Sequence, residues 1–132
     1  MPKRLQLRGK QLAELRDKIY ARAQGCCDYC GIGVPNDGWH LHHRQLRSGS
    51  GPDTPENCIV THPWCHNQIH AEPLSSMETG FIVSRYRTPH LAPIMIHNRM
   101  WMVTASQYGG RVSLWMPTDE PGSFYSFTPV RE

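Results

Sequence analysis

The chain has 132 residues, enough for one domain, and its hydrophobic content of 39% allows only a modest core. No apolar run approaches the length of a membrane-spanning helix, so an integral membrane protein is not expected. Five cysteines are an odd number, and no apolar run resembles a signal peptide. We therefore expect a reducing compartment, a cytoplasm, in which thiols bind metal rather than form disulfides.

The net charge of +3 is small but unevenly distributed. Residues 1–50 hold nine Lys and Arg against four acids, whereas residues 51–70 hold no Lys or Arg. A basic N-terminal half favours an anionic partner, and nucleic acid is the commonest one. On charge alone, a solubilising tail is an equally good interpretation.

Residues 1–10 are predicted to form a basic N-terminal arm, because they show no apolar period. From Gln11 to Gln24, apolar residues recur at helical spacing, and Gly25 follows as a stop. This pattern predicts an amphipathic helix that packs over the core, with Arg22 on its solvent-exposed side.

The next motif is Cys27-x-x-Cys30, followed by Gly31, which has the spacing of a zinc knuckle. His62-x-x-Cys65 repeats the same gap further along the chain. Together the two motifs predict a tetrahedral structural zinc, because four sulfur and nitrogen donors suit that ion. The predicted ligands are Cys27, Cys30, His62 and Cys65.

Between and after these motifs, the pattern predicts a strand, a loop, a second strand and a short helix. The first strand is Trp39–His43, in which Trp39 and Leu41 would face a core and His40 and His42 the other side. The loop contains Ser48–Pro52. The second strand is Cys58–Thr61, and the helix is Trp64–His70. This order is a ββα unit, which we place in a domain of residues 11–78.

His66 and His70 lie four residues apart on the predicted helix, so both imidazoles can bind one cation. His42 from the facing strand would supply a third ligand. Such a shell leaves coordination positions open for water and phosphate oxygens, which is typical of a catalytic metal site. A second structural zinc that also uses Cys65 is the competing interpretation.

His43 is predicted to act as a base rather than as a ligand. Adjacent strand residues point to opposite faces, so His42 and His43 can serve one site only if the strand ends there. The loop that begins at Arg44 allows this. A neutral imidazole beside the metal can then remove a proton from water.

Three further side chains are predicted to support this site. Asn57 can bond backbone groups across the loop and hold His43 in orientation. Arg44 and Arg47 are placed to bind flanking phosphates. The remaining histidines, His40 among them, are interpreted as exposed or hydrogen-bonded residues without a role in the site.

Residues 79–132 are predicted to form a β-rich extension, a small hairpin or meander, followed by a tail. The expected strands are Phe81–Ser84, Ile94–Ile96, Met100–Thr104 and Arg111–Met116. The expected turns lie at residues 97–99 and 108–110. The fold class is therefore α+β: a zinc-stapled ββα core with an N-terminal helix and a C-terminal β extension.

The residues Leu41-His42-His43, Asn57 and Cys65–His70 resemble the motif of the HNH endonucleases, which are ββα-metal nucleases. The resemblance runs from about Arg16 to about Pro73. It implies one divalent metal on the three predicted ligands, His43 as general base, Asn57 as a structural asparagine, and cleavage of DNA to 5′-phosphate and 3′-hydroxyl ends. A weaker likeness over residues 80–115 to small phage HNH proteins implies a terminase partner in a phage-infected bacterial host.

Two positions depart from the usual pattern of this family. His62 stands where cysteine is usual, and His42 stands where many members have aspartate. A histidine ligand is compatible with Ni, Co or Zn as well as with Mg or Mn, so the identity of the catalytic metal stays open.

The favoured function is a metal-dependent DNA endonuclease that nicks DNA or cuts both strands. One alternative is a zinc-binding nucleic-acid-binding module or assembly factor without strong nuclease activity. Another is a site-specific homing or restriction enzyme. The small size and the absence of a recognisable helix-turn-helix argue against recognition of a long site. The oligomeric state is not predicted.

Overall fold

The computed structural model describes residues 6–49, 51–89, 92–96, 99–104 and 114–117. Its elements, in chain order, are α1 (Gly9–Arg22), β1 (His40–His43), the short 3-10 helix η1 (Arg47–Gly49), β2 (Cys58–Thr61), α2 (Pro63–Ala71), α3 (Pro73–Thr79), β3 (Ile94–Ile96), β4 (Arg99–Thr104) and β5 (Leu114–Pro117). The predicted α+β class is confirmed.

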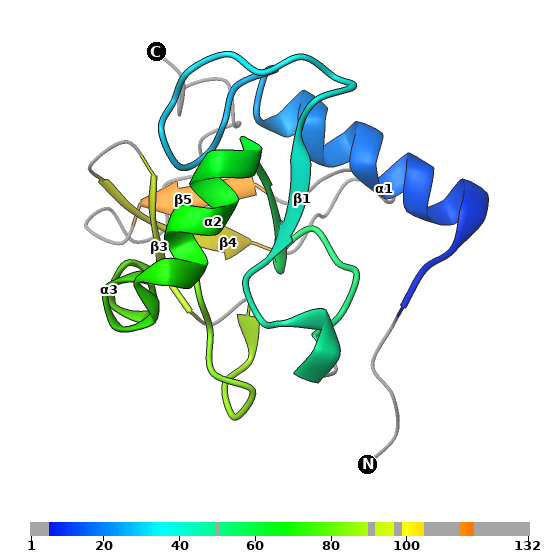
Figure 1. The fold of residues 1–132 in the computed structure, drawn as a ribbon. Coiled ribbons are helices and arrows are strands. Elements are labelled where there is room, and N and C mark those ends of the chain that lie inside the picture. The colour runs from blue at the N-terminus through cyan, green and yellow to red at the C-terminus, as the bar shows by residue number, and fades with distance from the viewer. Residues whose placement is uncertain (1–5, 50, 90–91, 97–98, 105–113, 118–132) are drawn as a thin grey trace.

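The ββα unit is present as predicted. β1 pairs antiparallel with β2, with His40 opposite Thr61 and His43 opposite Cys58. α2 begins at Pro63, where a proline suits the first helical turn because its missing N–H has no helical partner there. Figure 1 shows α2 beside β1. The helix therefore presents its side chains to the histidine-bearing strand.

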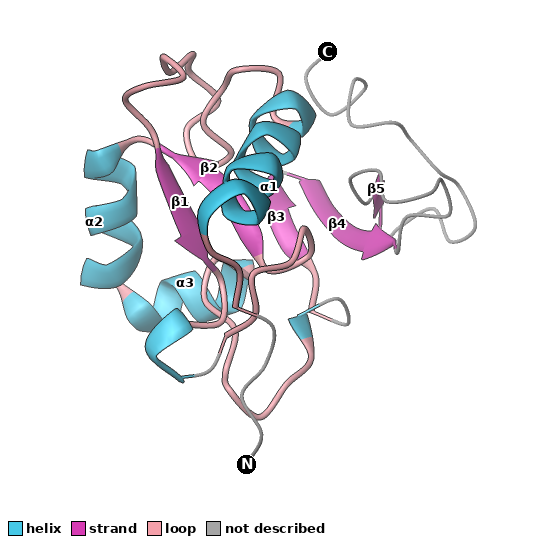
Figure 2. Cartoon of the chain, turned by 90° about the vertical axis from the view of Figure 1, so that its right-hand side faces the viewer, coloured by secondary structure: helices cyan, strands magenta, loops and turns pink. Residues whose placement is uncertain are grey.

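β2 lies between the two hydrophobic cores of the protein, and all four of its residues are buried. Because side chains alternate along a strand, Cys58 and Val60 face one core and Ile59 faces another. α1 packs against the first of these cores and is seen in front of β2 in Figure 2. The first core contains Leu15, Ile19, Ala23, Val34, Trp39, Cys58 and Val60, and the second contains Ile59, Ile69, Phe81, Ile94 and Ile96.

α1 begins and ends two residues earlier than predicted. Gln24 and Gly25 both have positive φ angles, of 54° and 72°, so the backbone leaves the helix before Gln24. The expectation that Arg22 is exposed was wrong, because only 1% of its surface is accessible. Arg22 lies three residues after Ile19 on the same helix face, and it donates to the Pro55 and Cys58 carbonyls at 2.7 and 2.6 Å.

The C-terminal extension contains an antiparallel meander in the order β3-β4-β5, as predicted. The predicted strand at Phe81–Ser84 was wrong. These residues pair with no strand in the described part of the chain, and instead Phe81 fills the second core while the Val83 amide donates to the Arg44 carbonyl at 2.8 Å. The predicted turn residues 97–98 and 108–110 and strand residues 111–113 lie outside the described residues.

α3 was not predicted, and it ends at a glycine that the packing requires. Gly80 has a φ of +85°, and a Cβ there would collide with the Pro93 backbone. This close approach brings the segment before β3 against the end of α3. None of the described helices is long and apolar enough to cross a bilayer.

Candidate metal centre and catalytic site

The structure brings His42, His66 and His70 together. One ring nitrogen of each lies within 4.8 Å of one from each of the others. His66 Nε2 and His70 Nε2 are 3.1 Å apart, and the His42 ring centroid lies 5.1 and 5.4 Å from those of His66 and His70. β1 supplies the first of these side chains and α2 the other two, so the ββα geometry creates the cluster.

His42 has the properties of a metal ligand. Its side chain is fully buried, and Nε2 lies 2.6 Å from the Phe81 carbonyl oxygen. A carbonyl only accepts, so Nε2 carries the proton and Nδ1 keeps a lone pair. That buried Nδ1 has no hydrogen-bond partner. Burial lowers the pKa of His42 to about 3, which keeps the ring neutral. A neutral imidazole with a buried, unused lone pair beside two others fits a divalent cation.

His40 contacts this cluster from outside, as one of the exposed, hydrogen-bonded histidines that the sequence predicted. Its Nδ1 lies 3.1 Å from His66 Nδ1, on the opposite edge of the His66 ring from His70. His66 thus has a histidine neighbour at each of its two ring nitrogens. Partial burial is the main cause that lowers the pKa of His66, and the neighbouring His70 and His40 lower it further. The strand alternation that placed His40 on the same side as His42 was the available signal for this contact.

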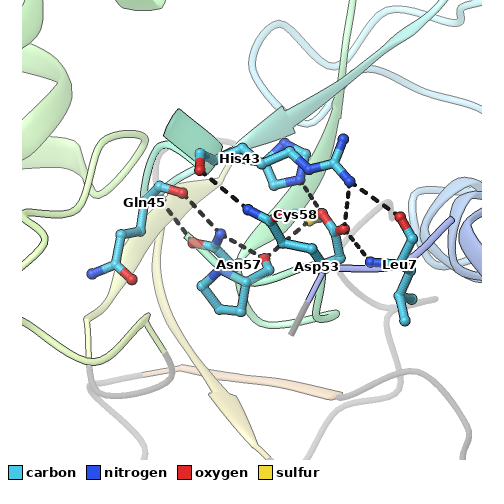
Figure 3. Close-up of polar contacts among 9 residues, drawn as sticks. Leu7, His43, Gln45, Asp53, Asn57 and Cys58 are labelled. Atoms are coloured by element: carbon cyan, nitrogen blue, oxygen red, sulfur yellow. Dashed lines mark hydrogen bonds and ion pairs between the residues drawn. The ribbon is translucent and has the colours of Figure 1, made fainter. Parts of the chain in front are cut away.

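His43 ends β1 and is bound by an acid that sequence reasoning missed. Its Nε2 lies 2.6 Å from Asp53 Oδ1, and the Asp53 side chain is fully buried (Figure 3). The ring is close enough to the metal cluster to contribute to the lowered pKa of His66. Asp53 lies in an irregular loop ten residues after His43, where no periodic pattern indicates a partner.

Asn57 closes the loop that carries Asp53. Its Nδ2 donates to the Gln45 carbonyl at 3.0 Å and to the Pro52 carbonyl at 2.9 Å, and its Oδ1 accepts from the Gln45 amide at 2.7 Å (Figure 3). These are bonds across the loop, of the kind expected from the sequence. The loop also needs Gly51, because a Cβ there would collide with the Gln45 carbonyl.

The prediction that Arg44 binds a phosphate was wrong. Its side chain is fully buried, and burial lowers its pKa to about 9, which leaves it charged at neutral pH. Its guanidinium donates to carbonyl oxygens rather than pointing to solvent. The acceptors belong to Glu56, Gly80, Pro89, Ala92 and Pro93.

Arg47 is the predicted phosphate ligand that remains accessible. Its side chain is 41% exposed, and its Nη2 donates to Asp53 at 3.0 Å and to the Leu7 carbonyl at 3.1 Å. It therefore lies at the edge of the loop that carries Asp53, with part of its side chain open to solvent.

The four predicted zinc ligands also converge, with donor atoms within 4.8 Å of one another. Cys30 Sγ lies 3.3 Å and Cys65 Sγ 3.9 Å from His62 Nδ1. His62 Nε2 lies 3.1 Å from the Gly33 carbonyl and donates to it, so Nδ1 is left as the ligand atom. A histidine at this position therefore suits the cluster.

The first half of this cluster has knuckle geometry. The Cys30 amide donates to Cys27 Sγ at 3.4 Å, and Gly31 takes a φ of +81°. Burial raises the pKa of the Cys27 thiol, and burial and the neighbouring Cys27 raise that of Cys65 to about 12. A cation between these sulfurs would favour the thiolates instead. All five cysteines are free of disulfides.

The two clusters use different residues, although α2 contributes to both. Cys65 joins the knuckle, whereas its neighbour His66 joins His42 and His70. This separation disfavours the competing interpretation, in which Cys65 and the two helical histidines hold a second structural zinc.

The fold and the two clusters define a ββα-metal unit. Comparison with known families agrees: residues 27–72 match the model of the HNH endonuclease family, so this segment of the chain is an HNH domain. The match includes both clusters and excludes α1, α3 and the meander. The HNH family is a nuclease family whose domains use divalent metals.

One curated relative extends the comparison. The chain is 36% identical over 58 residues to the type IV methyl-directed restriction enzyme EcoKMcrA of Escherichia coli strain K12. The alignment covers 39% of this chain and 21% of the relative, so the chain spans about a fifth of that enzyme's length. No solved structure matches the chain.

Proposed function

We propose that the chain is a metal-dependent endonuclease that hydrolyses DNA phosphodiester bonds. The observation that carries the proposal is the buried, unpartnered Nδ1 of His42 beside His66 and His70. A lone pair buried without a donor costs free energy unless something binds it, and a divalent cation accounts for it. The neighbouring His43 then supplies a base that is not a ligand.

In this proposal, the side chains of the site have separate roles. His42, His66 and His70 would hold a divalent ion, which supplies positive charge to the scissile phosphate and the leaving oxygen. His43 accepts the proton of the attacking water. Asn57 keeps the loop closed behind His43, and Arg47 contacts a flanking phosphate.

Finer features of the proposal have separate support. The match to part of a restriction enzyme keeps site-specific cleavage open as an alternative. We extend the proposal to a terminase partner on the sequence resemblance of residues 80–115 to small phage HNH proteins alone. A zinc-binding nucleic-acid-binding module without strong activity is the second candidate, because the cysteine and histidine cluster alone would serve it.

Incubation with supercoiled plasmid tests the proposal directly. We expect the metal-free protein to be inactive and to nick plasmid on addition of at least one of Mg, Mn, Co, Ni or Zn, with EDTA stopping the reaction. The His70→Ala protein is expected to lose this response, because two of three ligands bind weakly. Retardation of DNA in a gel without cleavage under any of these metals would instead favour the binding module.

The structural zinc has its own test. We expect Cys30→Ser to lose about one equivalent of zinc and to melt at a lower temperature, because metal binding to such sites contributes directly to folding. Cys26→Ser is the matched control, since Cys26 lies in the same segment but outside the cluster. Metal analysis and thermal unfolding of both variants suffice. Equal zinc content in the two variants would remove Cys30 from the site.

A further inference from the structure

We infer that Asp53 is the positioning residue of the base His43, and that the backbone amide of Leu7 holds Asp53 in place. The inference rests on the proposed function, and it adds an acid and an N-terminal contact to the site. Both contacts appear in Figure 3, where Asp53 lies between His43 and Leu7.

The contact with Asp53 determines which ring nitrogen of His43 carries the proton. An ionised carboxylate only accepts hydrogen bonds, so the 2.6 Å contact to Asp53 Oδ1 places the proton of His43 on Nε2. The lone pair is then on Nδ1, which becomes the atom that takes the proton from water. Asp53 thus selects the reactive ring nitrogen and fixes the ring plane, as an acid does for histidine in other enzymes.

Asp53 is itself held by two further donors. Its Oδ2 accepts from the Leu7 amide at 2.6 Å and from Arg47 Nη2 at 3.0 Å. With His43 on Oδ1, three donors satisfy a carboxylate that has no exposed surface. A buried carboxylate needs such donors, since a missing one would leave a desolvated charge. The orientation of His43 therefore depends on contacts made by residues far away in the sequence.

Further contacts hold residues 6 and 7 of the N-terminal segment beside Asp53. The Leu7 carbonyl accepts from Arg47, and the Gln6 side chain donates to the Arg47 carbonyl at 3.4 Å. The Leu7 side chain packs against the core beneath α1. Residues 6 and 7 lie outside residues 27–72, the segment that matches the HNH family. The contact between the Leu7 amide and Asp53 therefore comes from a part of the chain outside the HNH domain.

Asp53→Asn gives a sharp test because an amide has only one oxygen. Two donors, the Leu7 amide and Arg47, face Oδ2, whereas one donor faces Oδ1. The asparagine oxygen is expected to turn to the side with two donors, which points its NH₂ at His43 Nε2. His43 must then carry its proton on Nδ1, the atom that should accept one.

The experiment measures the tautomer and the activity on the full chain. We expect ¹⁵N NMR of the histidine side chains to report an Nε2–H tautomer for His43 in the wild type and an Nδ1–H tautomer in Asp53→Asn, in the presence of diamagnetic Zn or Mg. Plasmid nicking by Asp53→Asn should fall by at least about 100-fold, the scale of general-base catalysis, while calorimetry shows unchanged metal affinity.

The N-terminal contact has a matched pair of variants. Leu7→Pro removes the amide hydrogen, whereas Leu7→Ala shortens the side chain and keeps the amide. We expect Leu7→Pro to nick at least about tenfold more slowly than Leu7→Ala, as the loss of one hydrogen bond to a charged group implies.

An unchanged His43 tautomer in Asp53→Asn, or equal nicking by the two Leu7 variants, would overturn the inference. If the wild type itself nicks no DNA, the proposed function fails, and the tautomer measurement still decides whether Asp53 positions His43.

Discussion

The His43→Ala protein is expected to nick plasmid about 10²- to 10⁴-fold more slowly than the wild type, the range over which a positioned base accelerates a reaction. Alanine removes the imidazole to which the proposed function assigns the proton of the attacking water. Calorimetric metal affinity should stay near the wild-type value, because His42, His66 and His70 are untouched.

His43→Gln is the matched control for the effect on folding. Alanine leaves Asp53 Oδ1 without the donor that now lies at 2.6 Å, which destabilises the fold by about 1–3 kcal/mol. Glutamine restores a donor but no base. We therefore expect His43→Gln to recover the wild-type melting temperature but not the plasmid-nicking activity. Nicking at the wild-type rate by either variant would show that another group accepts the proton.

Much of this site could be predicted from the sequence because it depends on short-range periodicity. The four-residue spacing of His66 and His70 on a helix, and the alternation around His42 on a strand, each follow from the geometry of one element. The two Cys and His motifs likewise have local spacings. Pairing two strands across one loop then brings all of these residues together.

The parts that escaped prediction depend on contacts between distant segments. Asp53 meets Leu7 across 46 residues, and Arg44 meets Ala92 across 48. Arg44 was misjudged because a basic residue beside a nuclease motif suggests phosphate, whereas burial against backbone carbonyls leaves no trace in the sequence.

Arg44→Met is expected to destabilise the fold by at least about 3 kcal/mol, because several buried carbonyls lose their donor and each such loss costs about 1–3 kcal/mol. The two shortest bonds reach Ala92 at 2.6 Å and Gly80 at 2.8 Å, and they tie the segment before β3 and the end of α3 to the residue that follows β1. Methionine fills similar space without any donor, so cavity formation contributes little.

Urea unfolding of three variants measures this effect. Arg85→Met makes the same chemical change at an exposed position, where the guanidinium contacts the exposed Tyr86, and should lower the free energy of unfolding by less than about 1 kcal/mol. Arg44→Lys keeps the charge, but one ammonium cannot reach carbonyls on several sides as a planar guanidinium does, so it should recover only part of the loss. If Arg44→Met unfolded at the same urea concentration as Arg85→Met, the bonds from Arg44 to the buried carbonyls would not stabilise the fold.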